Sequence, residues 1–285
     1  MIDSISEKTG GSIREVCRVL EMPRSSYYHA SAETPTRADD HELGDEIAKI
    51  FTRNRRRYGY RRIVDELADN EIACGAARVR RLMKERNLHA IQPKSFAPKT
   101  SDGKASAPSA NLLEGKPLPA LPNKVWAGDI TFIPTVGGWL YLAVVIDLCS
   151  RRVVGWSLAD NMRADLVVAA LEQALCTRNH GSGLKFHSDR GSQYGSNAFR
   201  AVLKRAGMEQ SMSARANPYD NAWTESFIGT LKLEMLQKGC FEDMGDAKAE
   251  IFEYIEAYYN TRRKHSSIGY MTPSQFESKT NTILN

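Results

Sequence analysis

The first apolar pattern along the chain lies between residues 12 and 20. Apolar side chains there recur at positions i, i+3, i+4 and i+7, which is the spacing of one face of an α-helix. Ser12, followed three positions later by Glu15, is the sequence of a capping box, in which each residue satisfies a backbone amide of the other at the start of a helix. The pattern predicts a short amphipathic helix that begins near Ser12.

A second short helix is expected directly afterwards, over residues 24–29. Pro23 suits the first turn of such a helix, and Arg24 and Ser25 would then face outward. Two helices joined by a tight turn are the layout of a helix-turn-helix DNA reader, which we expect within residues 1–35. A helical hairpin that buries its two tyrosines fits the same pattern and stays open as an alternative.

Three further amphipathic helices are predicted from apolar stripes at 43–51, 60–67 and 79–83. Residues 49–62 contain seven basic residues and no acid. Because exposed helix faces normally mix both signs of charge, this run favours contact with phosphate groups. We therefore predict a helical, basic DNA-binding domain over residues 40–91. Its candidate DNA contacts are Arg55, Arg56, Arg57, Arg61 and Arg62.

Residues 92–122 lose this periodicity and gather six of the chain's eleven prolines, which predicts an extended, poorly ordered linker. Beyond the linker the residues become typical of β-strands. Runs rich in β-branched and aromatic residues predict three strands joined by short turns, at 125–135, 139–147 and 153–157. The pattern then predicts a helix at 161–179, a strand at 184–187, a helix at 197–206, a strand at 208–212 and a helix at 221–238.

This order of elements is that of the ribonuclease H-like fold. We therefore expect an α/β catalytic core over residues 123–240, in which a mixed five-stranded sheet is covered by helices, preceded by the all-α region. Helical periodicity continues over residues 241–285, which we expect to form a C-terminal helical extension. A chain of 285 residues exceeds what one hydrophobic core usually fills, so several domains are expected.

Composition narrows the class of protein. The formal net charge is +5, and a basic surplus suits a polyanionic partner. The five cysteines are scattered without Cys-x-x-Cys spacing, and we expect reduced, buried thiols in a cytoplasmic, nucleoid-associated bacterial protein. We expect no membrane association, because no apolar run is long enough to cross a bilayer.

Three carboxylates carry the candidate chemistry. Asp129 lies in the first predicted strand, Asp189 just after the fourth, and Glu225 near the start of the helix at 221–238, with 35 residues between the last two acids. A lone aspartate is more often a cap or a surface group, but acids on three neighbouring elements can hold hard divalent cations. Two Mg²⁺ ions, with Mn²⁺ as a substitute, would then support an in-line displacement at phosphorus.

Basic residues near these acids are candidate DNA contacts. Lys232 follows Glu225 by seven positions, which is about two helical turns, so both side chains project from one face. Arg190 lies in a turn after the second aspartate, where the backbone could approach DNA. The basic cluster at 262–265 fits either a phosphate contact or a charged helix end.

The residues around the three acids resemble those of the DDE transposases of insertion sequence family three. The motifs are Trp-x-x-Asp-Ile-Thr around Asp129, His-Ser-Asp-Arg-Gly-Ser-Gln-Tyr around Asp189, Asn-Ala-Trp-Thr-Glu-Ser-Phe around Glu225, and Tyr-Asn-Thr-Arg-x-x-His-Ser-Ser-Ile from residue 259. The resemblance spans about residues 124–277. It includes the acid spacing that the family shares with retroviral integrases.

The resemblance implies a transposase whose three acids bind two divalent ions. In that family a water cuts DNA at the end of the element, and the freed 3′ hydroxyl attacks another strand. The implied partners are terminal inverted repeats, target DNA, further copies of the chain on DNA, and the product of an upstream reading frame. The chain lacks sustained heptads, so it resembles the second-frame product alone.

Two other functions remain open from the sequence. A ribonuclease H-like nuclease that cuts without joining strands uses the same metals and carboxylates. A non-catalytic DNA-binding repressor would depend on the N-terminal helices and carry the acids as relics.

Overall fold

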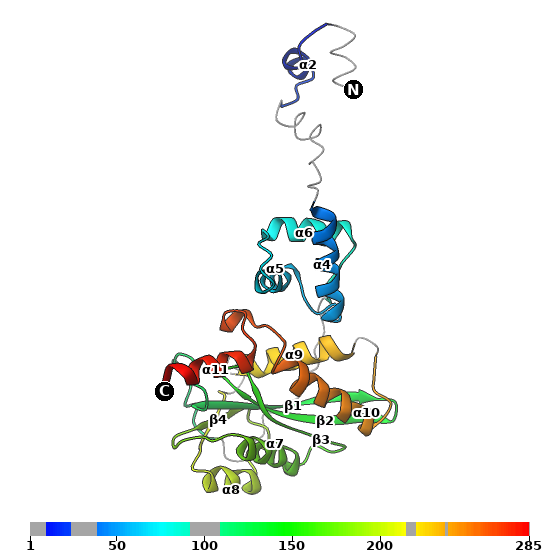
Figure 1. The fold of residues 1–285 in the computed structure, drawn as a ribbon. Helices are drawn as coiled ribbons and strands as arrows, with labels where there is room; N and C mark the ends of the chain where they lie inside the picture. The colour runs from blue at the N-terminus through cyan, green and yellow to red at the C-terminus, as the bar shows by residue number, and fades with distance from the viewer. Residues whose placement is uncertain (1–9, 24–38, 92–108, 215–220, 237–238, 285) are drawn as a thin grey trace.

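The computed structural model describes residues 10–23, 39–91, 109–214, 221–236 and 239–284 (Figure 1). The first helix, α2 (Ile13–Val19), begins as predicted. The amide of Ser12 donates to Glu15 Oε2 at 2.9 Å, and the amide of Glu15 donates to Ser12 Oγ at 3.3 Å, which completes the capping box. The second short helix expected at 24–29, with Arg24 and Ser25, lies outside the described residues.

The three helices predicted between residues 40 and 91 form a separate bundle. They are α4 (Asp40–Arg53), α5 (Tyr60–Asp69) and α6 (Ala76–Glu85), and together we refer to them as the three-helix block. Their apolar stripes meet in one cluster that buries Ile47, Ile63 and Val79 completely. Asp40 is buried at one end of α4 and accepts hydrogen bonds from two arginines of α6. The block therefore has its own apolar core.

The predicted mixed sheet is present. Its strands are β1 (Val125–Thr135), β2 (Gly138–Asp147), β3 (Val153–Ala159), β4 (Lys185–Ser188) and β5 (Glu209–Met212), in the spatial order β3-β2-β1-β4-β5. The first three strands pair antiparallel, while β4 pairs parallel with β1 and with β5. Strand β1 is therefore the central strand, and a side chain halfway along it is screened from solvent by neighbours on both sides.

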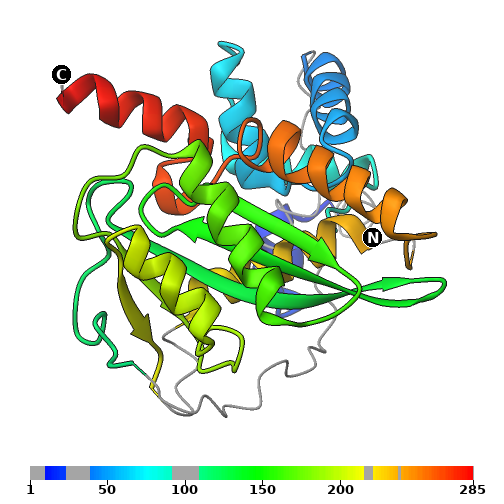
Figure 2. The same ribbon diagram turned by 90° about the horizontal axis from the view of Figure 1, so that it is seen from below.

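Helices cover both faces of this sheet (Figure 2). On one face α7 (Ala164–Thr177) and α8 (Asn197–Arg205) bury a layer that includes Trp126, Phe186 and Phe199. On the other face α9 (Ala222–Met235) and α10 (Met244–Phe252) bury a second layer that includes Ile133 and Phe227. Alternate residues of β1 thus face different helices.

The C-terminal residues belong to the second apolar layer of the core. Helix α10 continues as a π-helix, η3 (Glu253–Tyr259), followed by a short 3₁₀ turn, η4 (Ser266–Ile268), and by α11 (Pro273–Leu284). An α-helical spacing from Tyr254 would bury Tyr258, yet Tyr259 is the more deeply buried of the two. The i→i+5 hydrogen bonding of a π-helix rotates the buried face, which an α-helical period does not anticipate.

Two further expectations are corrected. The second half of the predicted linker is held against β5, because the amide of Leu112 donates to Ser211 Oγ at 2.9 Å. All five cysteines are free thiols, but Cys176 and Cys240 are exposed. Within the described ranges, we find no helix with the length and apolar character that a membrane span requires.

Candidate active site

Asp129 lies in the middle of β1 and is 9% exposed. It pairs across the antiparallel ladder with Val144. Because side chains alternate along a strand, Asp129 shares the face of Ile133, which packs in the layer beneath α9. Its Oδ1 accepts a hydrogen bond from the amide of Ile130 at 2.8 Å. The carboxylate is therefore held at the sheet surface below α9.

Asp189 comes directly after β4, as the sequence predicts. The parallel ladder pairs Ala127 of β1 with His187 of β4, so Asp129 and Asp189 each lie two residues beyond that pair. Neighbouring strands are about 4.8 Å apart, which brings the two acids side by side. Asp189 Oδ1 accepts from the amide of Gly191 at 2.9 Å, so the turn after β4 fixes the carboxylate.

Glu225 lies in the first turn of α9 and is exposed. This turn is stabilised by Thr224, whose hydroxyl donates to the side chain of Asn221 at 2.8 Å. An acid at a helix start also interacts favourably with the helix dipole. Lys232 lies on the same face of α9 two turns later and is half-buried.

The charges of these four residues interact. Burial, then the neighbouring charge of Asp189 and more weakly that of Glu225, raise the pKa of Asp129 to about 8. The charge of Lys232 lowers the pKa of Asp129. The pKa of Lys232 itself is lowered by burial and raised, to a smaller extent, by the charge of Asp129. The site is therefore a concentration of negative charge around one buried carboxylate, with one cation beside it.

Hard oxygen donors of this kind fit divalent cations. In the described part of the chain, no three His, Cys, Asp or Glu side chains are gathered closely enough to form a finished metal site. The carboxylates nevertheless interact, since the charges of Asp189 and Glu225 add to burial in raising the pKa of Asp129. A divalent cation would neutralise the repulsion, so the donor set and its electrostatics suit such an ion.

Tyr194 is a residue of the site that sequence reasoning missed. Its ring is 2% exposed and contacts Phe186 below the two aspartates, and its pKa is raised by burial and then by Asp129 and Asp189. Within the described ranges its hydroxyl has no hydrogen-bond partner. The sequence signal was present, because Tyr194 ends the motif that surrounds Asp189.

Several predicted DNA contacts take part in intramolecular contacts. Arg55 forms an ion pair with Glu253 at 3.0 Å, and the Arg57 guanidinium lies 4.3 Å from the centre of the Tyr258 ring. Arg62 Nε donates to a backbone carbonyl of the C-terminal segment at 2.9 Å. The remaining two of the five candidate arginines, Arg56 and Arg61, are exposed.

The loop arginine and the C-terminal basic cluster are also engaged. Arg190 Nε donates to the carbonyl of Ser213 at 2.9 Å, which ties the turn after β4 to the end of β5. In the cluster at 262–265, Arg262 is exposed but the other three members are buried. The cluster is therefore neither a free charged helix end nor, for its buried members, an open phosphate contact.

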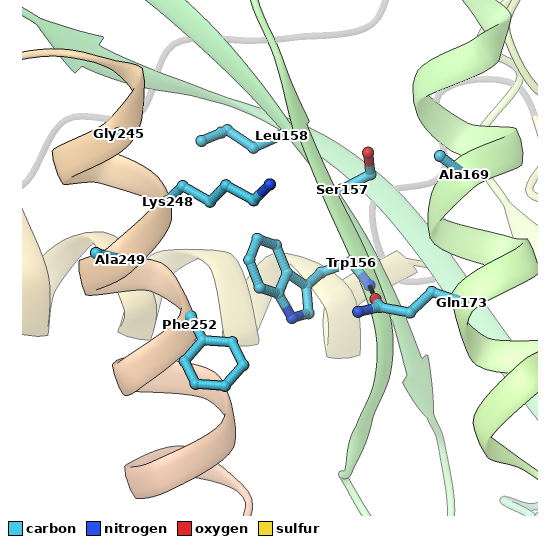
Figure 3. Close-up of a pocket in the computed structure, with 9 residues that line it drawn as sticks. All are labelled: Trp156, Ser157, Leu158, Ala169, Gln173, Gly245, Lys248, Ala249 and Phe252. Atoms are coloured by element: carbon cyan, nitrogen blue, oxygen red, sulfur yellow. Dashed lines mark hydrogen bonds between the residues drawn. The ribbon is translucent and has the colours of Figure 1, made fainter.

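One cavity among the described residues lies away from the carboxylates. It has a volume of about 720 Å³ and is lined by Trp156 and Leu158 of β3, Gln173 of α7 and Phe252 of α10 (Figure 3). Strand β3 is the edge strand, two positions from β1. None of the three acids lines this cavity, so it is not part of the carboxylate site.

The sequence matches models of known protein families. Residues 119–218 and 206–273 match models described as "Integrase core domain", and residues 37–96, which contain the three-helix block, match an "HTH-like domain". Among solved structures, the simian T-cell lymphotropic virus intasome complex with a PP2A regulatory subunit is 15% identical with a TM-score of 0.47, covering 81% of this chain and 74% of that one. The HTLV-2 integrase catalytic core in complex with magnesium is 19% identical with a TM-score of 0.43, covering 55% and 97%.

Curated relatives are closer. Transposase InsF for insertion sequence IS3A of Escherichia coli (strain K12) is 40% identical over 272 residues, which is 94% of each chain. The transposase for insertion sequence element IS904 of Lactococcus lactis is 42% identical over 236 residues, covering 82% of this chain and 93% of the relative. Nearly full-length similarity at this level, together with the integrase core, means that the chain belongs to the IS3 family of insertion-sequence transposases and is a polynucleotidyl transferase that acts on DNA.

Proposed function

We propose that this transposase cuts and joins DNA at the carboxylate site formed by Asp129, Asp189 and Glu225. The observation that carries the proposal is the parallel register of β1 and β4, which sets the two aspartates side by side beneath the helix that bears the glutamate. The electrostatic influence of both other acids on Asp129 supports it. Each acid comes from a different element, so together they can surround a divalent cation.

The proposal includes two divalent ions, Mg²⁺ or in its place Mn²⁺, shared by the three carboxylates. When bound, such ions polarise an attacking oxygen and stabilise the leaving oxygen in a displacement at phosphorus. The HTLV-2 integrase core, a protein of similar fold, was solved with magnesium. On this chain, Asp129 would need its carboxylate charged, and cation binding would favour that form over the proton.

The remaining residues of the site position DNA. Lys232 projects from the face of α9 that carries Glu225, so its ammonium would neutralise a DNA phosphate beside the acids. Arg190, anchored to Ser213, would hold the turn after β4 in place where the DNA strand enters the site. The proposed substrates are the terminal inverted repeats and a target DNA, and the proposed assembly is at least two copies of the chain on DNA with the product of the upstream reading frame.

Strand transfer on labelled terminal DNA in the presence of Mg²⁺ tests the proposal. The Glu225→Gln variant should bind this DNA as the unmodified chain does but neither cut nor join it. Glu172→Gln is the matched control, because Glu172 is a glutamate with an arginine partner at 2.8 Å on the surface of α7, and it should keep full activity. Cutting without joining in the unmodified chain would favour the nuclease alternative, and DNA binding without either reaction would favour the repressor.

A further inference from the structure

The face of α9 opposite Glu225 carries a second, buried glutamate. Glu234 lies nine positions after Glu225, which is a rotation of roughly 180° around a helix of 3.6 residues per turn. Glu225 is exposed, whereas Glu234 is 6% exposed. The helix therefore presents one carboxylate to the proposed active site and the other to the protein interior.

Glu234 is held by a network of charged and polar partners. Arg263 donates to both of its oxygens, through Nε at 3.1 and 3.2 Å and through Nη2 at 2.9 Å. The Tyr254 hydroxyl donates to Oε2 at 2.9 Å. Arg263 is itself 6% exposed. A buried, bidentate ion pair of this kind fixes the orientation of both side chains, because rotation of either one would leave the other with an unpaired buried charge.

The residue that follows Arg263 points to the three-helix block. Lys264 Nζ pairs with Asp65 and Asp69 of α5, and the amide of Lys264 donates to the Tyr58 hydroxyl at 3.1 Å. The same hydroxyl donates to the carbonyl of Arg262 at 3.0 Å. Figure 1 shows the three-helix block lying beside α9 and beside the segment between η3 and η4 that contains Lys264. Two consecutive residues thus connect the block to the back of α9.

A second contact reaches the end of α9 directly. The Arg57 guanidinium, from the loop between α4 and α5, lies over the rings of Tyr258 and Tyr254 at 4.3 and 5.2 Å. It also donates to the carbonyl of Glu234 at 3.5 Å. Both contacts converge on Glu234 and on Tyr254, the residue that holds its carboxylate.

We infer that Glu234 is a positioning residue that couples the docking of the three-helix block to the placement of α9. When Lys264 is held by Asp65 and Asp69, the adjacent Arg263 is fixed, and through Glu234 it sets the rotation and tilt of the helix that carries Glu225 and Lys232. The inference rests on the proposed function for the role of those two residues. It assigns to a DNA-reading domain a direct mechanical influence on catalysis.

The sharpest test changes the residues of the three-helix block that hold Lys264. The double variant Asp65→Asn and Asp69→Asn removes the two nearest carboxylate partners of Lys264 without changing any residue of the catalytic core. It leaves Glu66, whose Oε1 lies 3.8 Å from Lys264 Nζ. It also removes two negative charges, which should leave affinity for terminal DNA equal or higher. At saturating DNA and Mg²⁺ we expect strand transfer to slow by roughly tenfold to a hundredfold, the effect of misplacing a catalytic group by about 1 Å.

The matched control changes the same charge within the same block. Asp45 and Glu85 pair with arginines inside the block, at 2.6 and 2.9 Å. The variant Asp45→Asn with Glu85→Gln should leave the strand-transfer rate unchanged. Glu234→Gln, at the proximal end, should reproduce the loss of rate and increase amide hydrogen exchange in α9, while the three-helix block keeps its protection.

The outcomes separate this inference from the proposed function. If the unmodified chain joins DNA and Glu225→Gln does not, but the Asp65 and Asp69 variant joins at the unmodified rate, the coupling is refuted and the proposed site stands. If Glu225→Gln remains active, the proposed site is refuted. In that case the coupling is tested separately, by amide hydrogen exchange: an Asp65 and Asp69 variant whose α9 exchanges at the unmodified rate would refute it. A loss of rate that vanishes at higher DNA concentration would also refute it, because that result indicates weakened DNA binding alone.

Discussion

Acidification should destabilise the protein through His265. This residue is 8% exposed, its ring contacts Tyr259 edge-on at 4.8 Å, and burial, then the charges of Arg263, Arg62 and Arg151, lower its pKa from 6.5 to about 2. The histidine is therefore neutral in the folded state at any moderately acidic pH, whereas in the unfolded chain it takes up a proton below about pH 6.5.

The sign and size follow from this difference. A group whose folded pKa is depressed contributes stability that is present above its unfolded pKa and is lost as the pH falls, because the unfolded state binds the extra proton. At pH 5.5 the free energy of unfolding should be lower by about 1 kcal/mol, and at pH 4.5 by about 3 kcal/mol, from this one group. Above pH 8 the contribution should be constant.

Chemical denaturation followed by tryptophan fluorescence at pH 8.0 and pH 5.5 measures this effect. Other groups also titrate in this interval, so His265→Gln serves as the reference. Between the two pH values the variant should lose about 1 kcal/mol less of its free energy of unfolding than the unmodified chain. Equal losses in both proteins would refute the reasoning, because they would mean that His265 is protonated in the folded state or is solvent-exposed.

Three further outcomes are expected. Asp129→Asn should lower cutting and joining of terminal DNA by at least about a thousandfold with unchanged DNA affinity, measured by gel assays and fluorescence anisotropy; equal activity would exclude Asp129 as a catalytic residue. Gly155→Ala should lower the free energy of unfolding by about 1 to 3 kcal/mol, because the added Cβ would lie 2.2 Å from the carbonyl of Ala170 in α7; an unchanged melting temperature would contradict this close approach. Glu277→Ala should lower the free energy of unfolding by about 3 kcal/mol in denaturant unfolding. The substitution leaves the Arg178 guanidinium, bound to both carboxylate oxygens at 2.8 Å, without its carboxylate partner. A change below about 1 kcal/mol would mean that the pair behaves as an ordinary surface ion pair.

The sequence by itself determined the elements and the order in which they follow one another. The capping box at Ser12, the apolar stripes of α4 to α6 and the β-branched runs of the sheet are local patterns, and local hydrogen bonding and side-chain period decide them. The positions of Asp129 and Asp189 at the middle of one strand and the end of another followed from the same patterns. Their adjacency required only that β1 and β4 be neighbours, which the order of elements indicated.

Only the tertiary structure decided the partners of the charged residues. The basic run of the three-helix block looked uniformly available for phosphate, yet Arg62 and Tyr58 contact a segment some two hundred positions away, and Lys264 is buried by acids of α5. Charge alone does not reveal such pairs, because a basic side chain is equally suited to DNA and to a distant carboxylate. The choice depends on which surfaces the folded chain brings together, and sequence spacing carries no information about that.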